Sequence, residues 1–97
     1  MKLLKDIIYG IRIIEIKGNT NIAVENIDFD SREVKNLSLF IAVKGVSQDG
    51  HNFISQAQNS GACAIICENL PDTLKDDITY IKVLDSSKSL GIVASNF

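Results

Sequence analysis

The chain has 97 residues, of which 45% are hydrophobic and 23% are charged, so we expect one small domain with a modest core. Its formal net charge is −2 and its ten basic residues are scattered, which excludes the basic stripe of a nucleic-acid-binding protein. No apolar run reaches the roughly 18 residues of a membrane span, and charges interrupt the apolar start, so we expect a cytoplasmic protein without a signal peptide.

The first 30 residues give the weakest structural signals. Apolar residues at positions 3, 4, 7 and 8 recur at helical spacing and end at Gly10, which predicts a short helix. Residues 11–16 alternate imperfectly, as in a strand, and Gly18-Asn19 predicts a turn. Residues 22–29 predict another extended segment, which ends just before a polar turn.

That polar turn, Asp30-Ser31-Arg32-Glu33, has two interpretations. An Asp with a Glu three residues later is typical of a capping box that begins a helical turn. Capping uses only the two acidic residues, whereas the Ser31 hydroxyl and the Arg32 guanidinium could donate to a phosphate or to a uracil carbonyl. The sequence leaves both interpretations open.

The middle of the chain predicts a strand, a helix and a second strand. Residues 39–43 form a continuous apolar run, which indicates a strand covered on both faces. Phe53, Ile54 and Ala57 mark one face of a helix that Gly61 could end, and residues 62–67 form a second buried strand. Short connections predict a right-handed βαβ unit with parallel strands.

The last third predicts a turn at Pro71-Asp72, a strand over residues 79–84, and a final helix capped by Asp85 or Ser86. That helix holds Leu90, Val93 and Ala94. The complete pattern predicts an α/β fold, namely a small α/β sandwich with a mixed sheet, as one domain over residues 1–97. Because the chain stops at Phe97 without a polar tail, we expect it to be a piece of a longer protein.

The two cysteines, Cys63 and Cys67, are predicted to be packing residues. In an extended strand their Cα atoms would lie about 13 Å apart, too far for a disulfide. The chain also lacks the further Cys and His residues of a zinc site, so we predict no metal ligands.

The loop Lys44-Gly45-Val46-Ser47-Gln48-Asp49-Gly50 is the candidate ligand-binding segment. It is predicted to leave the carboxyl end of a parallel strand and enter a helix, where ligands of open α/β sheets bind and backbone N–H groups favour anions. The alternative is an ordinary Gly-containing turn. His51, the only histidine, is predicted to be structural rather than catalytic, because no nucleophile or second metal ligand forms a pattern with it.

A set of segments follows in fixed order along the chain. These are Asp30-Ser31-Arg32, Leu39-Phe40-Ile41-Ala42, Gly45, Asp49-Gly50-His51-Asn52-Phe53-Ile54, Ala57 and Gly61-Ala62-Cys63-Ala64. In order and spacing they resemble the N-terminal domain of the Mur ligases, particularly the MurE type. The resemblance covers most of the chain. It implies docking of the UDP part of UDP-MurNAc-L-Ala-D-Glu, with a central domain that binds ATP and a third domain that receives the amino acid, diaminopimelate or lysine.

The resemblance also implies a set of substrate contacts. The implied contacts with the UDP part are Phe29, Ser31, Arg32, Val46, Ser47 and Gln48. The chain differs from the family pattern at Asn36-Leu37-Ser38, where a Gly is usual, and at Val46, where a polar residue is frequent.

A phosphate-binding loop ending in Gly-Lys-Thr or Gly-Lys-Ser is absent from these 97 residues. We therefore expect no catalytic residue and no cofactor in this chain, whereas the full-length enzyme would use ATP and magnesium. The expected partners are the UDP-MurNAc-dipeptide substrate and the other domains of the ligase, without nucleic acid or membrane. Two alternatives remain, the N-terminal domain of a MurF-type ligase and a free-standing module that binds a nucleotide or a protein.

Overall fold

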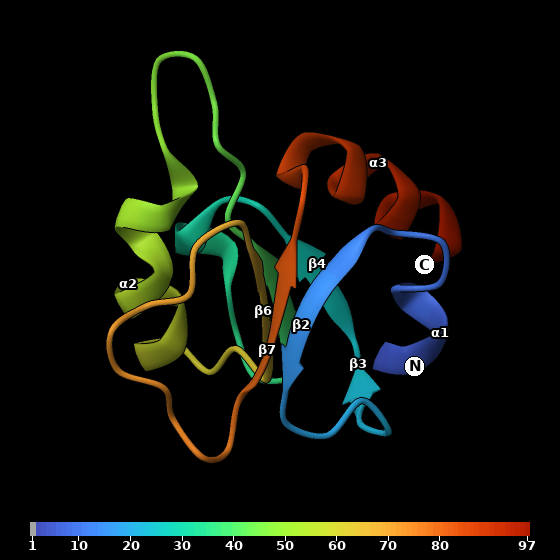
Figure 1. Ribbon diagram of the computed structural model, residues 1–97. Coiled ribbons are helices and arrows are strands. Elements are labelled where there is room, and N and C mark those ends of the chain that lie inside the picture. The colour runs from blue at the N-terminus through green and yellow to red at the C-terminus, as the bar shows by residue number, and fades with distance from the viewer. Residues whose placement is uncertain (1) are drawn as a thin grey trace.

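A mixed β-sheet with helices against both faces organises the computed structural model, which describes residues 2–97 (Figure 1). The strands are β1 (Lys2–Leu3), β2 (Ile13–Lys17), β3 (Ala23–Val24), β4 (Asn26–Asp28), β5 (Ser38–Ile41), β6 (Ala64–Cys67) and β7 (Thr79–Val83). The helices are α1 (Leu4–Ile7), α2 (Ile54–Asn59) and α3 (Ser86–Asn96), with the short 3₁₀ helices η1 (Ser31–Glu33) and η2 (Gly50–Phe53).

The main sheet has five strands in the order β2-β7-β6-β5-β4. Strands β4 to β7 run parallel to one another, and β2 pairs with β7 in the antiparallel direction. The predicted mixed sheet and the parallel pair β5 and β6, joined through α2, are therefore confirmed. Gly61 follows α2 with φ of 108°, the left-handed conformation in which glycine commonly ends a helix.

The extended segment predicted over residues 22–29 is divided in the structure. Ala23 and Val24 form β3, which pairs with β1 in a separate two-stranded sheet, whereas β4 belongs to the main sheet. Between them, the backbone N–H of Glu25 donates to the carbonyl of Leu37, 2.9 Å away. The chain therefore changes its pairing partner at Glu25, which the local apolar pattern does not reveal.

Two apolar clusters lie on opposite faces of the main sheet. One combines α1 and α3 with inward residues of the strands, such as Leu39 and Ile66, and the other combines α2 with Phe40, Ile65 and neighbouring residues. Successive residues of β5 and β6 therefore point to opposite clusters, and every residue of both strands is buried. This arrangement is the physical reason for their continuous apolar sequence.

Both cysteines pack inside the domain with free thiols. Cys67 lies in β6 and is buried, and burial raises the pKa of its thiol to about 11. The Sγ of Cys63 lies 3.7 Å from the carbonyl oxygen of Ala23. Their predicted role as packing residues is thus confirmed.

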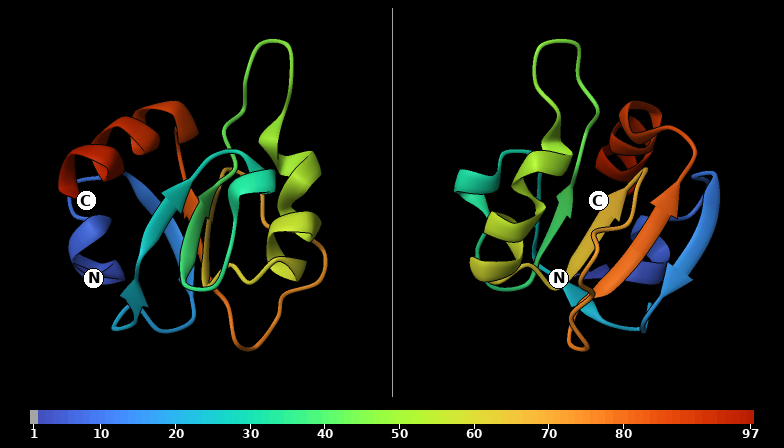
Figure 2. Two further views of the ribbon diagram at one scale, coloured as in Figure 1. Left: turned by 180° about the vertical axis from the view of Figure 1, so that it is seen from behind. Right: turned by 60° about the vertical axis from the view of Figure 1, so that its left-hand side comes forward.

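The last helix joins the two ends of the described chain. Asp85 is its N-cap and accepts a hydrogen bond from the backbone N–H of Lys88 at 3.0 Å. Near the other end of the helix, the backbone carbonyl of Asn96 accepts from Lys2 Nζ at 3.1 Å. The side-chain Nδ2 of Asn96 donates to the carbonyls of Ile7 and Tyr9. The two ends therefore lie together beside α1 and α3 (Figure 2). Among residues 2–97, no helix combines the length and apolar character needed to cross a bilayer.

Candidate functional site

A cavity of about 710 Å³ lies at the carboxyl end of β5, between η1 and the loop that follows the strand. Its lining residues are Phe29, Asp30, Ser31, Arg32, Val43, Gly45, Gln48, Gly50, Phe53 and Gln56. They come from the polar turn and the residue before it, from the glycine-containing loop and the residue before it, from η2, and from the first turn of α2. This edge of a parallel sheet is where open α/β folds bind ligands.

The cavity brings together four of the six residues that the resemblance implies as contacts. Phe29, Ser31 and Arg32 line one wall, and Gln48 lines the other. Val46 and Ser47 do not line the cavity. They lie at the exposed tip of the loop, which projects above the domain as the green hairpin at the top of Figure 1.

The polar turn is held by one carboxylate. Asp30 is the N-cap of η1, and its Oδ1 accepts from the backbone N–H of Arg32 at 3.0 Å. Both carboxylate oxygens also accept from the Arg32 guanidinium, Oδ1 from Nε at 3.0 Å and Oδ2 from Nη2 at 2.7 Å. These side-chain bonds, followed by the backbone bond, lower the pKa of Asp30 from 3.8 to about 2. The capping interpretation is confirmed for Asp30, and the charge of Arg32 is already balanced.

Ser31 joins η1 to α2 at one side of the cavity. The residue is buried, and its hydroxyl donates to Oε1 of Gln56 on α2 at 3.0 Å. The neighbouring Phe29 leaves 64% of its surface exposed. The same cavity is therefore lined by an aromatic ring and by a hydroxyl–amide pair.

The loop after β5 is a narrow hairpin rather than an irregular segment. Lys44 and Asp49 form an isolated antiparallel bridge, and the Gly45 N–H donates to the carbonyl of Gln48 at 3.1 Å. The Gly50 N–H donates to the Val43 carbonyl at 2.8 Å. A Cβ on Gly50 would lie 2.8 Å from the Val43 nitrogen, so the close approach of the two stems requires glycine there.

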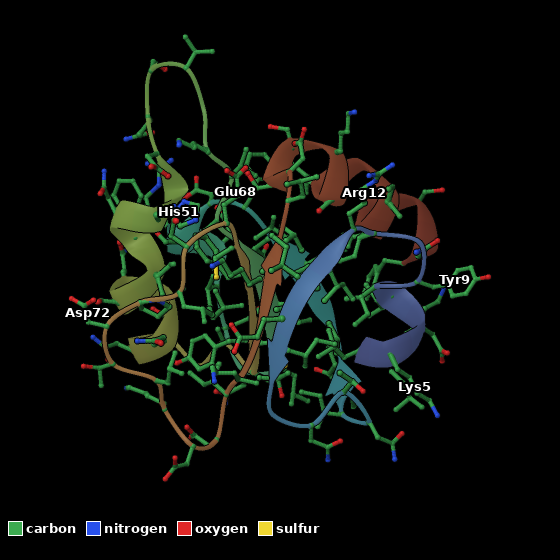
Figure 3. All side chains as sticks on the ribbon, in the orientation of Figure 1. Lys5, Tyr9, Arg12, His51, Glu68 and Asp72 are labelled. Carbon is green, nitrogen blue, oxygen red and sulfur yellow. The ribbon has the colours of Figure 1, made fainter. Side chains whose placement is uncertain are left out.

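One stem of this hairpin is attached to the end of β6 by His51. Its Nδ1 lies 2.7 Å from Oδ1 of Asp49. Its Nε2 accepts from the backbone N–H groups of Glu68 and Asn69, at 2.9 and 3.2 Å. Figure 3 shows His51 and Glu68 close to each other in the region between α2 and α3. Both ring nitrogens are engaged, so the structural role predicted for His51 is confirmed.

The other stem is attached to the same place through Ser86. The Ser86 hydroxyl accepts from the Lys44 backbone N–H at 2.9 Å and donates to Oε2 of Glu68 at 2.8 Å. The backbone N–H of Ser86 donates to the same oxygen at 2.9 Å. Sequence reasoning did not single out Glu68. Its available signal is its position, an acidic residue directly after a buried strand at the ligand edge.

A second cavity of about 500 Å³ lies away from this edge, near the start of β5 and the end of α2. Its lining residues are Asn36, Leu37, Gln58, Gly61, Ala62, Cys63, Lys75, Asp77 and Ile78. Leu37 has φ of 64°, a left-handed conformation. The departure from the family pattern at residues 36–38 therefore puts a branched side chain where glycine is better suited. Across residues 2–97, no three His, Cys, Asp or Glu side chains group as metal ligands would.

Comparison with known proteins identifies relatives of this domain. Residues 23–97 match the Mur ligase family, catalytic domain. The chain is 48% identical over 95 residues to the UDP-N-acetylmuramoyl-L-alanyl-D-glutamate--2,6-diaminopimelate ligase of Cytophaga hutchinsonii, covering 97% of this chain and 20% of that protein. It is 45% identical over 94 residues to the ligase of the same name from Clostridioides difficile, covering 97% of this chain and 19% of that protein. The chain thus spans about a fifth of the length of these relatives.

Solved structures with the same fold are also ligases of this kind. MurF from Acinetobacter baumannii matches with a TM-score of 0.65 and 30% identity, covering 75% of this chain and 15% of that one. The MurF ligase of Thermotoga maritima in complex with ADP matches with a TM-score of 0.62 and 35% identity, over 73% of this chain and 16% of that one. The sequence resemblance to the MurE type is confirmed, and the chain belongs to the Mur ligase family.

Proposed function

We propose that this chain is the N-terminal domain of a MurE-type ligase and docks the UDP part of UDP-MurNAc-L-Ala-D-Glu. The observation that carries the proposal is the cavity at the carboxyl end of β5, which is lined by Phe29, Ser31 and Arg32 of the first implied contact segment and by Gln48 of the second. Its volume lies within the usual range for small-molecule sites. The identity of the substrate is inferred from the names of the relatives, which specify this muramoyl dipeptide.

Neutral groups would hold most of the ligand. Asp30 and Arg32 neutralise each other at one wall, so the cavity lining has no uncompensated positive side chain. The diphosphate would therefore be met by Gln48 and by backbone N–H groups at the tip of the hairpin, since those of Lys44, Gly45 and Gly50 already donate within the domain. The exposed Phe29 ring offers a flat apolar surface to the base.

The chemistry of the longer enzyme would take place outside this chain. In the longer cytoplasmic enzyme of peptidoglycan synthesis that we propose, other domains would hold ATP and magnesium, which would supply the activation of the terminal carboxylate of the substrate for attack by an amino acid. Residues 2–97 contain no group of three or more His, Cys, Asp or Glu side chains that could hold a metal ion, and the sequence has no Gly-Lys-Thr or Gly-Lys-Ser loop. The residues of this chain do not fit ATP–magnesium, so its contribution is substrate docking.

Titration of the ¹⁵N-labelled chain with UDP-MurNAc-dipeptide, UDP and ADP tests the proposal. We expect UDP and the full substrate to shift backbone resonances of residues 29–32 and 45–50, with ADP much weaker. Binding of ADP alone, or no shift at millimolar UDP, would contradict docking.

Ser31→Ala tests the contribution of one cavity hydroxyl to docking. We expect UDP binding to weaken by about 1 kcal/mol, the net value of one hydrogen bond. Ser55→Ala, at an exposed position of α2 outside the cavity lining, is the matched control. Equal UDP affinity in both folded variants would reject a role for Ser31.

A MurF-type ligase is the second candidate, because the structural matches described above are MurF enzymes. The longer protein can be assayed with the muramoyl dipeptide and diaminopimelate, and separately with the muramoyl tripeptide and D-alanyl-D-alanine. Turnover of the first pair supports the MurE type, and turnover of only the second pair supports the MurF type.

A further inference from the structure

In the structure, the hydrogen bond between Ser31 and the exposed Gln56 runs from the serine hydroxyl to the amide oxygen. The two atoms, Ser31 Oγ and Gln56 Oε1, lie 3.0 Å apart. An amide oxygen has no proton to give, so the proton of this bond belongs to the serine hydroxyl. Ser31 is buried, with only 6% of its surface exposed, and both residues line the cavity.

This direction determines what the hydroxyl can offer a ligand. A hydroxyl has one proton, and Gln56 already receives it. The remaining positions around Oγ are lone pairs, which accept hydrogen bonds. A ligand atom that meets this oxygen is stabilised when it carries a proton, and it is left unsatisfied when it is itself an acceptor, such as a phosphate oxygen.

The surroundings of Ser31 favour a neutral ring over the diphosphate. Asp30 and Arg32 form an ion pair there, with a contact of 2.7 Å between Oδ2 and Nη2, so the one basic side chain of the cavity lining is already paired. Phe29 lines the same cavity, and its side chain is largely exposed. A nucleobase is the part of the ligand that combines a flat face with polar edge groups.

We propose that Gln56 is a positioning residue that fixes the Ser31 hydroxyl as an acceptor, and thereby selects uracil over cytosine. The inference rests on the proposed function and deepens it. Uracil carries N3–H, a donor that Ser31 Oγ accepts, next to a carbonyl that can accept from the Gln56 amide group. Cytosine has an unprotonated N3, which would face the lone pairs of the same oxygen.

Comparison of UDP with CDP in Gln56 variants tests this inference. In the wild-type chain we expect UDP to bind roughly tenfold more tightly than CDP. The reason is that N3–H of uracil would be satisfied by Ser31 Oγ, whereas the unprotonated N3 of cytosine would be left without a donor. Gln56→Met keeps the length of the side chain but cannot accept the proton, so the preference should fall to about twofold. Gln56→Glu keeps an acceptor, so the preference should be retained even though its added charge weakens both ligands. Ser55→Ala, on the same helix, should behave as the wild type.

The possible failures are distinguishable. If the wild type binds neither UDP nor the muramoyl substrate, the proposed function and this inference both fail. If the wild type binds UDP but Gln56→Met keeps the full preference, or the wild type shows none, Gln56 does not set the selectivity while docking stands.

A measurement without ligand covers the case in which Gln56→Met does not fold. Ser31→Ala should shift the side-chain amide resonances of Gln56, and Ser55→Ala should leave them in place. Unchanged Gln56 resonances in folded Ser31→Ala would mean that the orienting hydrogen bond is not formed, and would overturn the inference.

Discussion

Asp30 caps η1 and binds the Arg32 guanidinium with the same carboxylate. The sequence allowed Asp30 as a cap and Arg32 as a phosphate donor, and in the structure the first role restricts the second. Arg32 would have to give up at least part of this ion pair to reach a ligand. Because 81% of its side chain is exposed, the pair itself contributes little to stability.

The titration of Asp30 follows from this pair. Its folded pKa is lowered from 3.8 to about 2, so the stabilising contribution is present above pH 3.8 and is lost as the pH falls toward 2. In Arg32→Gln we expect the pKa of Asp30 to rise toward 3.8, while the backbone N–H of residue 32 keeps it somewhat lower. NMR titration of the side-chain carboxyl carbon measures it. An unchanged pKa in the variant would show that the guanidinium is not the cause.

Leu37 is strained by its backbone conformation. With φ of 64°, its Cβ crowds the following carbonyl, and glycine avoids this cost. Leu37→Gly should therefore raise the free energy of unfolding by about 0.5–1 kcal/mol, after allowing for the greater freedom of glycine in the unfolded chain. Urea denaturation measures the change. Leu37→Ala keeps the Cβ and should give no gain, and equal stability of the Ala and Gly variants would contradict the explanation.

At the scale of elements, the hairpin after β5 is the segment that gives the site its shape. Its two stems are tied to the Glu68-Asn69 dipeptide, one through His51 and the other through Ser86. Because that dipeptide follows β6 directly, the position of the hairpin is set by the buried sheet. The exposed tip around Val46 lies outside these attachments.

Ser86→Ala tests this attachment. The substitution removes the acceptor of the Lys44 N–H and one donor to Glu68, at a residue with no exposed surface. We expect a loss of about 1–3 kcal/mol in the free energy of unfolding, together with faster amide hydrogen exchange at Lys44. Ser87→Ala, at the exposed next position, should change stability by less than about 0.5 kcal/mol. Unaltered exchange at Lys44 in Ser86→Ala would argue against the tie.

The elements that the sequence predicted well are those whose signals are local. The runs that became β5 and β6 are apolar because both faces are covered, and Gly61 marks the end of α2. The division between β3 and β4 was not predicted, because it depends on pairing with β1 and on the distant Leu37 carbonyl. Local patterns carry no information about such partners.

The same limit applies to the site. Its two walls were predicted from the polar turn and the glycine-containing loop, which are contiguous in sequence. Gln56 and Glu68 were not identified, since each acts through a partner far along the chain, Ser31 and Ser86 respectively. Nothing adjacent to Gln56 in sequence distinguishes it from an ordinary exposed helix residue.

At the scale of the whole molecule, the main sheet has an exposed edge strand, β2. All five residues of β2 are exposed, including Ile13, Ile14 and Ile16, and no strand within residues 2–97 pairs with its outer edge. A register shift between Ile13 and Glu15, and an ion pair of 3.1 Å between Glu15 and Lys17, oppose further pairing. The register shift and the ion pair disfavour strand pairing at this edge. Burial of the exposed isoleucines would still favour association.

We therefore expect weak, concentration-dependent association of this chain through β2. Ile14→Glu should lower the apparent mass at high protein concentration in sedimentation experiments and should change the stability by less than about 0.5 kcal/mol. Ile14→Val, which keeps an apolar edge, should associate as the wild type does. A wild-type chain that stays monomeric at millimolar concentration would contradict the expectation.

The contact between Lys2 and Asn96 has a practical consequence for handling the domain. Both lie on the side of α1 and α3, away from η1 and α2 (Figure 2), whereas the cavity is lined by residues of η1 and α2. A tether or surface linkage at either end would leave the ligand entrance unobstructed. A short peptide bridge could even close the polypeptide into a ring, with fresh termini cut into the exposed stretch of residues 72–77.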